Sequence, residues 1–294
     1  MTGSPTVKGR AARRLIVTAD DFGMSPEINE AVEQAHREGI LTCASLVVAG
    51  RAAEDAIRRA RRMPGLGVGL HLALLDAPAM APGPSAMAPG GGDLGASPVS
   101  TGIVIMLPGK ARAAARREIE AQLEAYRKSG LELAHLDGHW HFHQHPGVLA
   151  MALELARPLG LRAVRVPYES PRFYSDITGR RVAPWRLPQA AGLSMLARGM
   201  RRRIAAAGLA TSDRFYGLRD AGHVGEEQLV RLAKRLPAGV TEAGLHPATG
   251  NARGPHALPA GWDPACEIAA LTSPAVREAI DASGVELCRW ADIA

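Results

Sequence analysis

Acidic, histidine and arginine side chains stand near the ends of several apolar segments that we predict to be β-strands. Asp20 and Asp21 follow the segment 14–19, and His71 lies late in the segment 67–74. Further along the chain, similar positions are occupied by Asp137, His139, Arg165, Tyr168 and His246. If the strands are parallel, their carboxyl ends meet on one rim, where the active sites of β/α barrels lie. An acidic pair alone could be an ordinary helix-capping turn, but several polar groups on one rim favour a catalytic site.

One segment places an ionisable side chain at every second position. Its members are His135, Asp137, His139, His141, His143 and His145. An extended strand would point all six to one face, with Leu136, Trp140 and Phe142 buried on the other. At about 3.3 Å per residue, His139 and His143 would lie about 13 Å apart, whereas a metal ligand lies within about 2.2 Å of its ion. One ion therefore cannot use the whole segment. We expect one ligand from the strand end, with the other side chains lining a pocket after the chain bends near Pro146.

These residue types are suited to metal-dependent hydrolysis. An ion held by one carboxylate and two imidazoles keeps positions open for water and substrate, lowers the pKa of water and polarises a carbonyl. Consecutive residues point in different directions, so one aspartate of a pair could bind the ion while the other accepts a proton. Two imidazoles suit Zn²⁺, but one carboxylate with several waters would also suit Mg²⁺, Mn²⁺ or Co²⁺. The sequence has no GxSxG elbow, P-loop or GxGxxG turn.

Alternating strands and helices must position these groups. We predict strands at 14–19, 41–48, 67–74, 132–138, 162–166, 214–218, 239–245 and 284–290. We predict helices at 26–39, 51–62, 110–129, 147–159, 187–207, 225–236 and 273–282. This alternation is typical of an α/β protein with a parallel sheet. Because no glycine-rich turn follows the first strand, we favour a single irregular TIM-like β/α barrel with seven or eight mostly parallel strands over a doubly wound sheet.

We expect one domain at 13–294, preceded by a flexible tail at 1–12. The segment 76–100 is rich in Pro, Gly and Ala, and we predict a long mobile loop there. The 294 residues are 47% hydrophobic and 22% charged, which excludes a disordered chain. No run of 18 apolar residues exists that could span a membrane.

The net charge of +6 comes from 35 basic and 29 acidic residues. Coding bias is one explanation, since arginines far outnumber lysines, and a basic surface for anionic lipid is another. Aromatic residues make up only 4% of the chain, which argues against nucleic acid as a partner. The three cysteines have no CxxC spacing, and the apolar run near the N-terminus is too short for a signal peptide. We therefore expect a cytoplasmic protein.

Five motifs, spread from about residue 13 to residue 292, resemble the YdjC-like carbohydrate deacetylase family and, more narrowly, its hopanoid-biosynthesis-associated branch. They are Thr18-Ala-Asp-Asp-Phe-Gly23 with Ser25-Pro26, Gly69-Leu-His71-Leu, His135-Leu-Asp-Gly-His-Trp-His-Phe-His-Gln-His-Pro146, Arg162-Ala-Val-Arg-Val-Pro-Tyr168 and Leu245-His-Pro-Ala-Thr249. The resemblance implies a deacetylase of N-acetylated sugars that uses one divalent metal ion on an irregular β/α barrel.

The resemblance also implies roles for individual residues. Asp21, His71 and His139 would hold the metal, Asp20 would be the base that activates water, and His246 would be the acid for the departing amine. We expect the substrate to be bound by Asp137, His141, His143, Arg165 and Tyr168. The branch more often has Asn-Ala where this chain has Asp137-Gly138, so a neighbour of the metal differs in charge.

The branch implies an N-acetylglucosamine-bearing hopanoid as substrate, and hence work at the inner membrane face. The segment 185–204 fits this idea, because it combines apolar residues with arginines in the manner of an interfacial helix. The apolar residues are Leu193, Met195, Leu196, Met200 and Ile204, and the arginines are Arg198 and Arg201, Arg202 and Arg203. An ordinary surface helix packed on the barrel is the alternative.

Two other functions remain open on the sequence. One is deacetylation of soluble chitooligosaccharides. The other is a non-catalytic protein that binds metal or lipid through the histidines. The carboxylate pair argues against it, because a protein that only stores metal needs no base beside the ion. The oligomeric state is also open, with a homodimer among the options.

Overall fold

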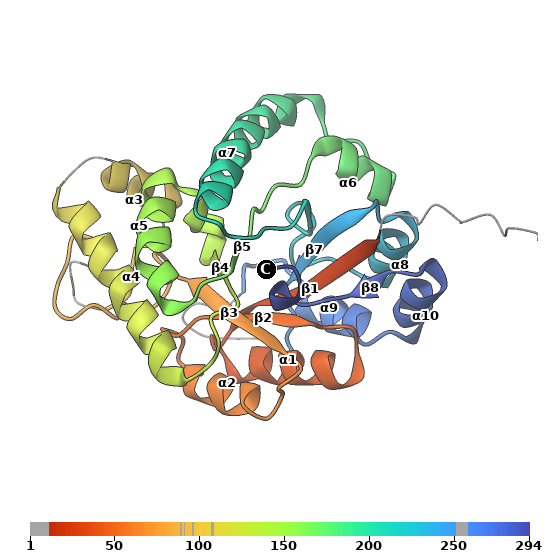
Figure 1. Cartoon of the computed structure of the whole chain (residues 1–294), viewed down its shortest axis with the longest axis horizontal. Coiled ribbons are helices and arrows are strands. Elements are labelled where there is room, and N and C mark those ends of the chain that lie inside the picture. The colour runs from red at the N-terminus through yellow and green to blue at the C-terminus, as the bar shows by residue number, and fades with distance from the viewer. Residues whose placement is uncertain (1–11, 89, 91, 96, 107–108, 251–257) are drawn as a thin grey trace, which may run out of the picture.

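A long central strand, β1 (Arg13–Phe22), organises the fold (Figure 1). The computed structural model describes residues 12–88, 90, 92–95, 97–106, 109–250 and 258–294. All but residue 12 of the predicted tail lies outside them, as do three residues of the segment 76–100. From Leu15 onward every residue of β1 is buried, because the strand is covered on both faces.

The sheet is parallel in every strand pairing that the structure describes. Its strand order is β5-β4-β3-β2-β1-β7-β6, and β8 pairs with β1 beside this path. The other strands are β2 (Cys43–Leu46), β3 (Gly67–Leu72), β4 (His135–Gly138), β5 (Ala163–Val164), β6 (Arg214–Tyr216), β7 (Gly239–Leu245) and β8 (Glu286–Leu287). The sheet curls into a half-barrel with helices on its outside (Figure 1). The predicted α/β barrel with seven or eight mostly parallel strands is confirmed.

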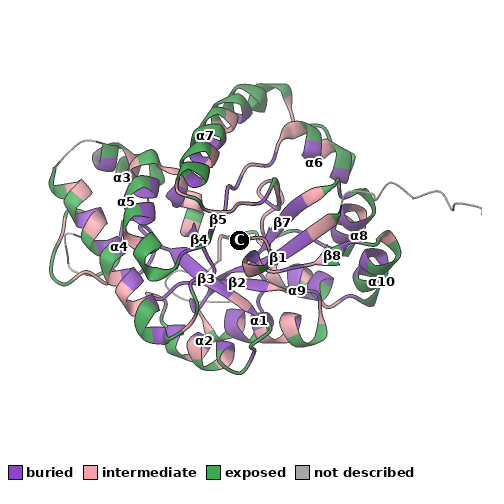
Figure 2. Ribbon diagram, viewed as in Figure 1, coloured by how far each residue is buried: buried purple, intermediate pink, exposed green. Residues whose placement is uncertain are grey.

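Each predicted helix is present. They are α1 (Pro26–Glu38), α2 (Ala53–Ala60), α4 (Lys110–Ser129), α5 (Pro146–Ala156), α7 (Leu187–Ala206), α8 (Glu226–Arg235) and α10 (Pro274–Ser283). The first shows why the sequence signals work: the Ser25 side chain accepts a hydrogen bond from the Ile28 amide, and Pro26 begins the helix. The helices place their apolar sides against the sheet, as the burial colours show (Figure 2).

Three further helices were not predicted: α3 (Pro98–Met106), α6 (Pro171–Thr178) and α9 (Pro264–Leu271). Two of them carry the same start signal as α1, because Ser170 and Asp263 cap helices that begin with proline. Short 3-10 turns occur at η1 (His139–Gln144), η2 (Arg157–Leu159), η3 (Pro184–Arg186) and η4 (Trp290–Asp292). None of the described helices has the length and apolar character needed to cross a bilayer.

The segment 76–100 has little regular structure before Pro98, as expected, but its described part is anchored to the domain. The Met80 and Ala81 amides donate to the Glu118 carboxylate of α4 at 3.0 and 2.8 Å. Met87 and Leu94 are buried. A few apolar side chains and one buried carboxylate are therefore enough to hold this segment against the domain.

Candidate active site

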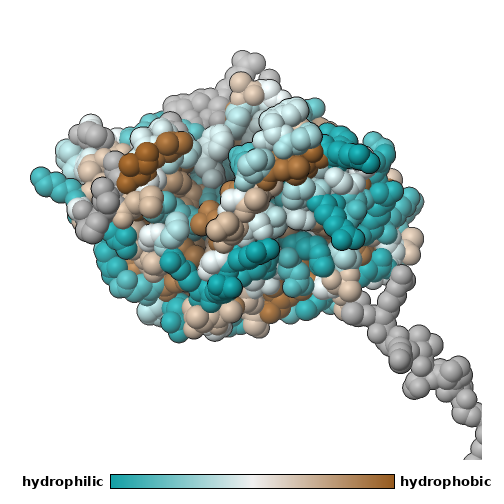
Figure 3. Space-filling view, turned by 90° about the horizontal axis from the view of Figure 1, so that it is seen from above, coloured by the Kyte–Doolittle hydropathy of each residue, from teal (hydrophilic) through white to brown (hydrophobic). Residues whose placement is uncertain are grey.

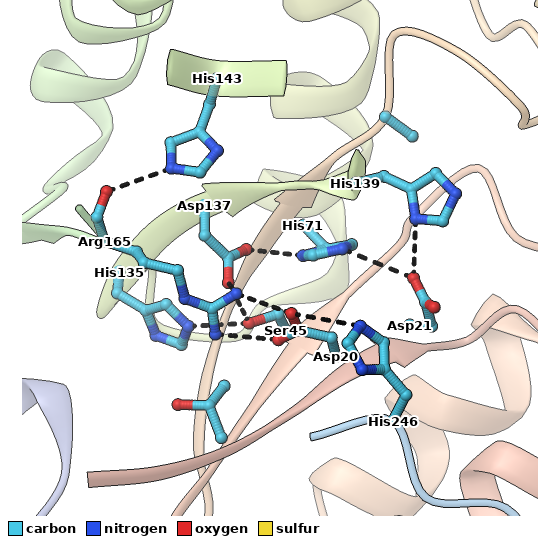
Figure 4. Close-up of polar contacts among 12 residues, drawn as sticks. Asp20, Asp21, Ser45, His71, His135, Asp137, His139, His143, Arg165 and His246 are labelled. Carbon is cyan, nitrogen blue, oxygen red and sulfur yellow. Dashed lines mark hydrogen bonds and ion pairs between the residues drawn. The ribbon is translucent and has the colours of Figure 1, made fainter. Parts of the chain in front are cut away.

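The carboxyl ends of four strands bring the predicted residues together (Figure 4). Asp20 and Asp21 lie near the end of β1, His71 on β3 and Asp137 on β4, while His246 directly follows β7. In the pairing of β3 with β4, His71 lies opposite Asp137. Asp21 has a φ of 61°, in the left-handed region, so the backbone turns between the two carboxylates.

Asp21, His71 and His139 form a compact group of three ligand-bearing side chains. Oδ1 of Asp21 lies 2.8 Å from Nδ1 of His139 and 3.5 Å from Nε2 of His71. One ligand atom from each residue lies within 4.8 Å of the others. One carboxylate and two imidazoles are a donor set that a divalent ion accepts.

The second nitrogen of His71 is held by Asp137. Nδ1 of His71 lies 2.7 Å from Oδ1 of Asp137, so Nε2 is directed at Asp21 (Figure 4). Asp137 also accepts a hydrogen bond of 2.7 Å from the Ser45 hydroxyl. Metal-binding histidines usually donate their second ring N–H to a carboxylate, a backbone carbonyl or water, and a carboxylate partner fixes the ring and raises its basicity. Burial alone would lower the pKa of His71, but the carboxylates of Asp137, Asp20 and Asp21 together outweigh burial and raise it to about 9.

A second group of close ligand atoms, Asp20, His71 and Asp137, shares His71 with the first. Its two carboxylates already bind Arg165: Nη1 lies 2.7 Å from Asp137 Oδ2, and the guanidinium binds both oxygens of Asp20, at 2.7 and 2.8 Å. A cation between them would displace or repel the arginine. The Asp21 group is therefore the better metal site.

Arg165 also contacts a third carboxylate, Glu242 of β7, through Nε at 2.9 Å and Nη2 at 2.7 Å. The Thr18 hydroxyl donates to the same Glu242 oxygen at 2.9 Å. Burial raises the pKa of Glu242 to about 7, against the opposing effect of Arg165. Sequence analysis missed Glu242, although a lone Glu inside the apolar strand Gly239–Leu245 was a usable signal.

Charge on the other acids follows from their neighbours. Burial alone would raise the pKa of Asp21, but the His139 and His71 rings hold it well below its ordinary value. Burial alone would also raise the pKa of Asp137, but Arg165 and His71 hold it well below its ordinary value. Both carboxylates therefore stay ionised at neutral pH.

A cavity of about 320 Å³ opens onto these residues. Its polar lining comes from Asp20, Asp21, His71, His139, His141 and His246, and its apolar lining from Trp140, Leu218, Ala221, Pro259 and Trp262, with Gly138 completing it. His246 Nε2 lies 3.8 Å from Oδ2 of Asp20. The base and acid candidates therefore face the same space as the candidate metal ligands.

The alternating histidine segment bends earlier than predicted. Trp140 and His141 both have a φ of 53°, so the chain leaves the extended conformation directly after His139 rather than near Pro146. The prediction that Trp140 is buried is wrong, since it is 50% exposed, whereas Phe142 is buried. The bend separates the side chains, and His139 and His141 line the cavity while His143 does not.

Of the five residues expected to bind substrate, His141 alone lines this cavity. Asp137, His143 and Arg165 are fully buried and bind protein groups, including a 3.1 Å contact from His143 Nε2 to the Arg165 carbonyl. Tyr168 lies in a different depression, beside Arg198 and Arg201 of α7. These four residues therefore lie outside the lining of the cavity that Asp20 and Asp21 share.

Known proteins resemble this chain over most of its length. The model of the YdjC-like protein family matches residues 14–282. The chain is 33% identical to a carbohydrate deacetylase of Mus musculus, over 95% of this chain and 94% of that protein. It is also 33% identical to a chitooligosaccharide deacetylase of Enterobacter sp. (strain 638), over 52% of this chain and 58% of that protein.

Among solved structures, a putative cellobiose-phosphate cleavage protein from Enterococcus faecalis V583 superposes with a TM-score of 0.69. It is 22% identical, and the match covers 96% of this chain and 99% of the other, so it supports the fold. The family model covers nearly the whole barrel, including every residue of the candidate metal group. The chain belongs to the YdjC-like protein family.

Proposed function

We propose that this protein is a carbohydrate deacetylase that hydrolyses the N-acetyl group of an N-acetylglucosamine-type sugar. The observation that carries the proposal is the pair Asp20 and Asp21, of which one carboxylate faces two imidazoles and the other faces an arginine, beside one cavity. Relatives over nearly the full length of the chain are carbohydrate deacetylases. A shorter match is a chitooligosaccharide deacetylase.

Asp20 is the residue we assign as the base. Arg165 binds both of its oxygens, which fixes the orientation of the carboxylate. Asp20 also lines the cavity, so a water held between it and Asp21 could give up its proton to Asp20 while attacking the acetyl carbonyl.

His246 is the residue we assign as the acid for the departing amine. Its ring lies in the cavity wall, with Nε2 3.8 Å from Asp20. Its position is fixed by its neighbours, because its backbone amide donates to Glu267 and its ring lies 4.6 Å from that of Trp262. A proton taken up by Asp20 therefore has a short path to the amine by way of His246.

Asp21, His71 and His139 would hold one divalent ion, which in such a site polarises the acetyl carbonyl and acidifies water. The residues present fit such an ion: their ligand atoms converge, and Asp137 fixes the ring of His71. Two imidazoles favour Zn²⁺, with Mg²⁺, Co²⁺ and Mn²⁺ as alternatives. Since both close ligand groups among the described residues share His71, the site suits a single ion and not the multiple ions of a storage protein.

The finer proposal is a glycosylated hopanoid as substrate, reached by a cytoplasmic enzyme that contacts the inner membrane face. Its structural support is apolar exposure on the side where α7 lies, where apolar patches stand among hydrophilic ones (Figure 3). Trp185 is 79% exposed and Met195 73% exposed. On α3, Val99, Ile103 and Met106 are exposed as well.

The structure limits which parts of segment 185–204 could touch lipid. Met200 and Ile204 are buried, and Arg201 and Arg203 bind backbone carbonyls of the protein. Arg198 and Arg202 are exposed as well and are not the arginines that make these carbonyl contacts, so they are better probes. If α7 binds anionic lipid, changing Arg198 and Arg202 together to Glu should reduce co-sedimentation with phosphatidylglycerol vesicles severalfold. Unaltered co-sedimentation would contradict the membrane contact without affecting the deacetylase assignment.

Acetate release decides the substrate class. The metal-loaded protein should release acetate from an N-acetylglucosaminyl hopanoid in detergent faster than from diacetylchitobiose. A clear preference for diacetylchitobiose would overturn the lipid substrate and keep the deacetylase. Absence of acetate from both, together with several bound metal ions per chain, would favour a non-catalytic metal-binding protein.

A further inference from the structure

Two of the four tryptophans of the chain line the cavity that holds Asp20 and Asp21. Trp140 comes from η1, and Trp262 precedes α9. Neither tryptophan supplies a proton or a metal ligand in the roles described above. Aromatic faces opposite polar groups are the usual means of binding a sugar ring, because its C–H face is apolar while its edge carries hydroxyls.

Trp262 is fixed in place beside His246. Its ring centroid lies 4.6 Å from that of His246. A Cβ on Gly222 would come within 2.3 Å of the Trp262 side chain, so only glycine leaves room for this indole. The Asp263 amide also donates to the Gly222 carbonyl at 2.8 Å. Trp262 is thus a rigid wall of the cavity.

Trp140 has the opposite character. Its backbone φ of 53° lies in the left-handed region, which bulky residues seldom adopt, and its side chain is half exposed. Neither burial nor backbone preference explains an indole here. The conformation does place it on the cavity rim, with its ring 5.9 Å from that of His139. Strained backbone at such a position is a common mark of a binding role.

The size of the cavity separates the tasks of the two tryptophans. At about 320 Å³, it stands at the small end of the range of ligand pockets, about 300–1,000 Å³. A single sugar ring beside the reacting acetyl group leaves little further space inside. The next ring of a longer substrate must therefore lie at the rim, where Trp140 is exposed.

We propose that Trp140 is a specificity-determining residue that stacks on the second sugar ring of an N-acetylated disaccharide or longer glycan, while Trp262 packs against the ring that reacts. This inference rests on the proposed deacetylase function with a chitooligosaccharide as substrate, since an N-acetylglucosaminyl hopanoid offers one sugar ring, and it adds the number of rings that the site recognises. It makes Trp140 a source of preference for the disaccharide over the monosaccharide.

The test compares kcat/KM for acetate release from N-acetylglucosamine and from diacetylchitobiose. Trp140→Ala should lower the value for the disaccharide about tenfold more than the value for the monosaccharide. Trp140→Phe should restore most of the preference, because it keeps an aromatic face. Trp262→Ala should lower both values. Leu159→Ala, which truncates an exposed apolar residue of η2 outside the cavity lining, is the matched control and should keep the wild-type preference.

An unchanged preference in Trp140→Ala would overturn the inference while acetate release upheld the proposed function. If the wild-type protein released no acetate from either sugar, the proposed function would fail for these substrates. The affinity of the Asp20→Asn protein for diacetylchitobiose, measured by calorimetry, would then test the role of Trp140 independently of catalysis. Affinity about tenfold weaker in the Asp20→Asn, Trp140→Ala double variant supports the inference, and equal affinity or absence of binding refutes it.

Discussion

Asp137 shows how one buried carboxylate can determine the chemistry of a neighbouring ligand. It binds Nδ1 of His71, leaves Nε2 for Asp21, and shares Arg165 with Asp20. The sequence predicted that Asp137 would lie in the site but not what it would touch. That information comes from the β3–β4 register, which the sequence does not encode locally.

Replacing Asp137 by Ala should weaken metal binding about 10- to 100-fold, as is typical for partners of metal-binding histidines. Asp137→Asn should lie between Ala and wild type, since an amide oxygen can still accept from Nδ1. Isothermal titration with Zn²⁺ measures the effect. Equal affinity in all three proteins would show that Asp137 does not position His71 for a metal.

Glu242 predicts a pH dependence of stability. Its pKa in the folded protein is about 7, above the ordinary value of 4.5. A carboxyl with a raised pKa favours the folded state while protonated, and this contribution is lost as pH rises from about 4.5 through 7. Between pH 5 and pH 8, the free energy of unfolding of wild type should therefore fall relative to that of Glu242→Gln, by roughly 1–3 kcal/mol.

Urea denaturation of both proteins at several pH values measures that difference. A difference that stays constant over this range would mean that Glu242 is ionised throughout. The buried group would then be a permanent ion pair with Arg165.

At the scale of elements, Gly69 of β3 leaves room for the buried His135 ring of β4. A Cβ on Gly69 would come within 2.4 Å of the His135 ring, and that ring also lies 3.1 Å from the Ser45 hydroxyl. Gly199 in α7 has open space at the same position. Alanine substitutions at Gly69 and Gly199 therefore compare a crowded glycine with one that has open space around it.

Gly69→Ala should lower the free energy of unfolding by about 1–3 kcal/mol, because the buried His135 ring must shift to admit the methyl group. Gly199→Ala should raise it by about 0.5–1 kcal/mol, since alanine favours a helix. Chemical denaturation measures both. A neutral Gly69→Ala would mean that the His135 ring moves freely, which would be at odds with its burial.

Many of the strands and helices could be predicted from the sequence, since strands that end in acids and helices that start at Ser-Pro follow from local chemistry. The early bend could not: the period of two across 135–145 suits a strand, and only tertiary contacts make Trp140 and His141 left-handed. Helices α6 and α9 were missed although Ser170 and Asp263 carried the same start signal as Ser25.

For the whole molecule, the half-barrel collects residues from distant parts of the chain on one rim. Arg165 of the segment after β5 contacts acids on β1, β4 and β7, so the sheet must close around it before the site exists. The sequence predicted the strand ends and hence the rim. It could not predict that Tyr168 would leave the rim for a depression beside α7.

The central claim is that Asp20 acts as the base of a deacetylase whose ion is held by Asp21, His71 and His139. The most direct measurement is acetate release from diacetylchitobiose by the metal-loaded wild-type protein and by Asp20→Asn, with bound metal determined in both samples. We predict acetate from wild type, a loss of at least about 100-fold in Asp20→Asn, and equal metal content. Comparable rates in the two proteins would contradict the claim, as would loss of the metal together with the activity.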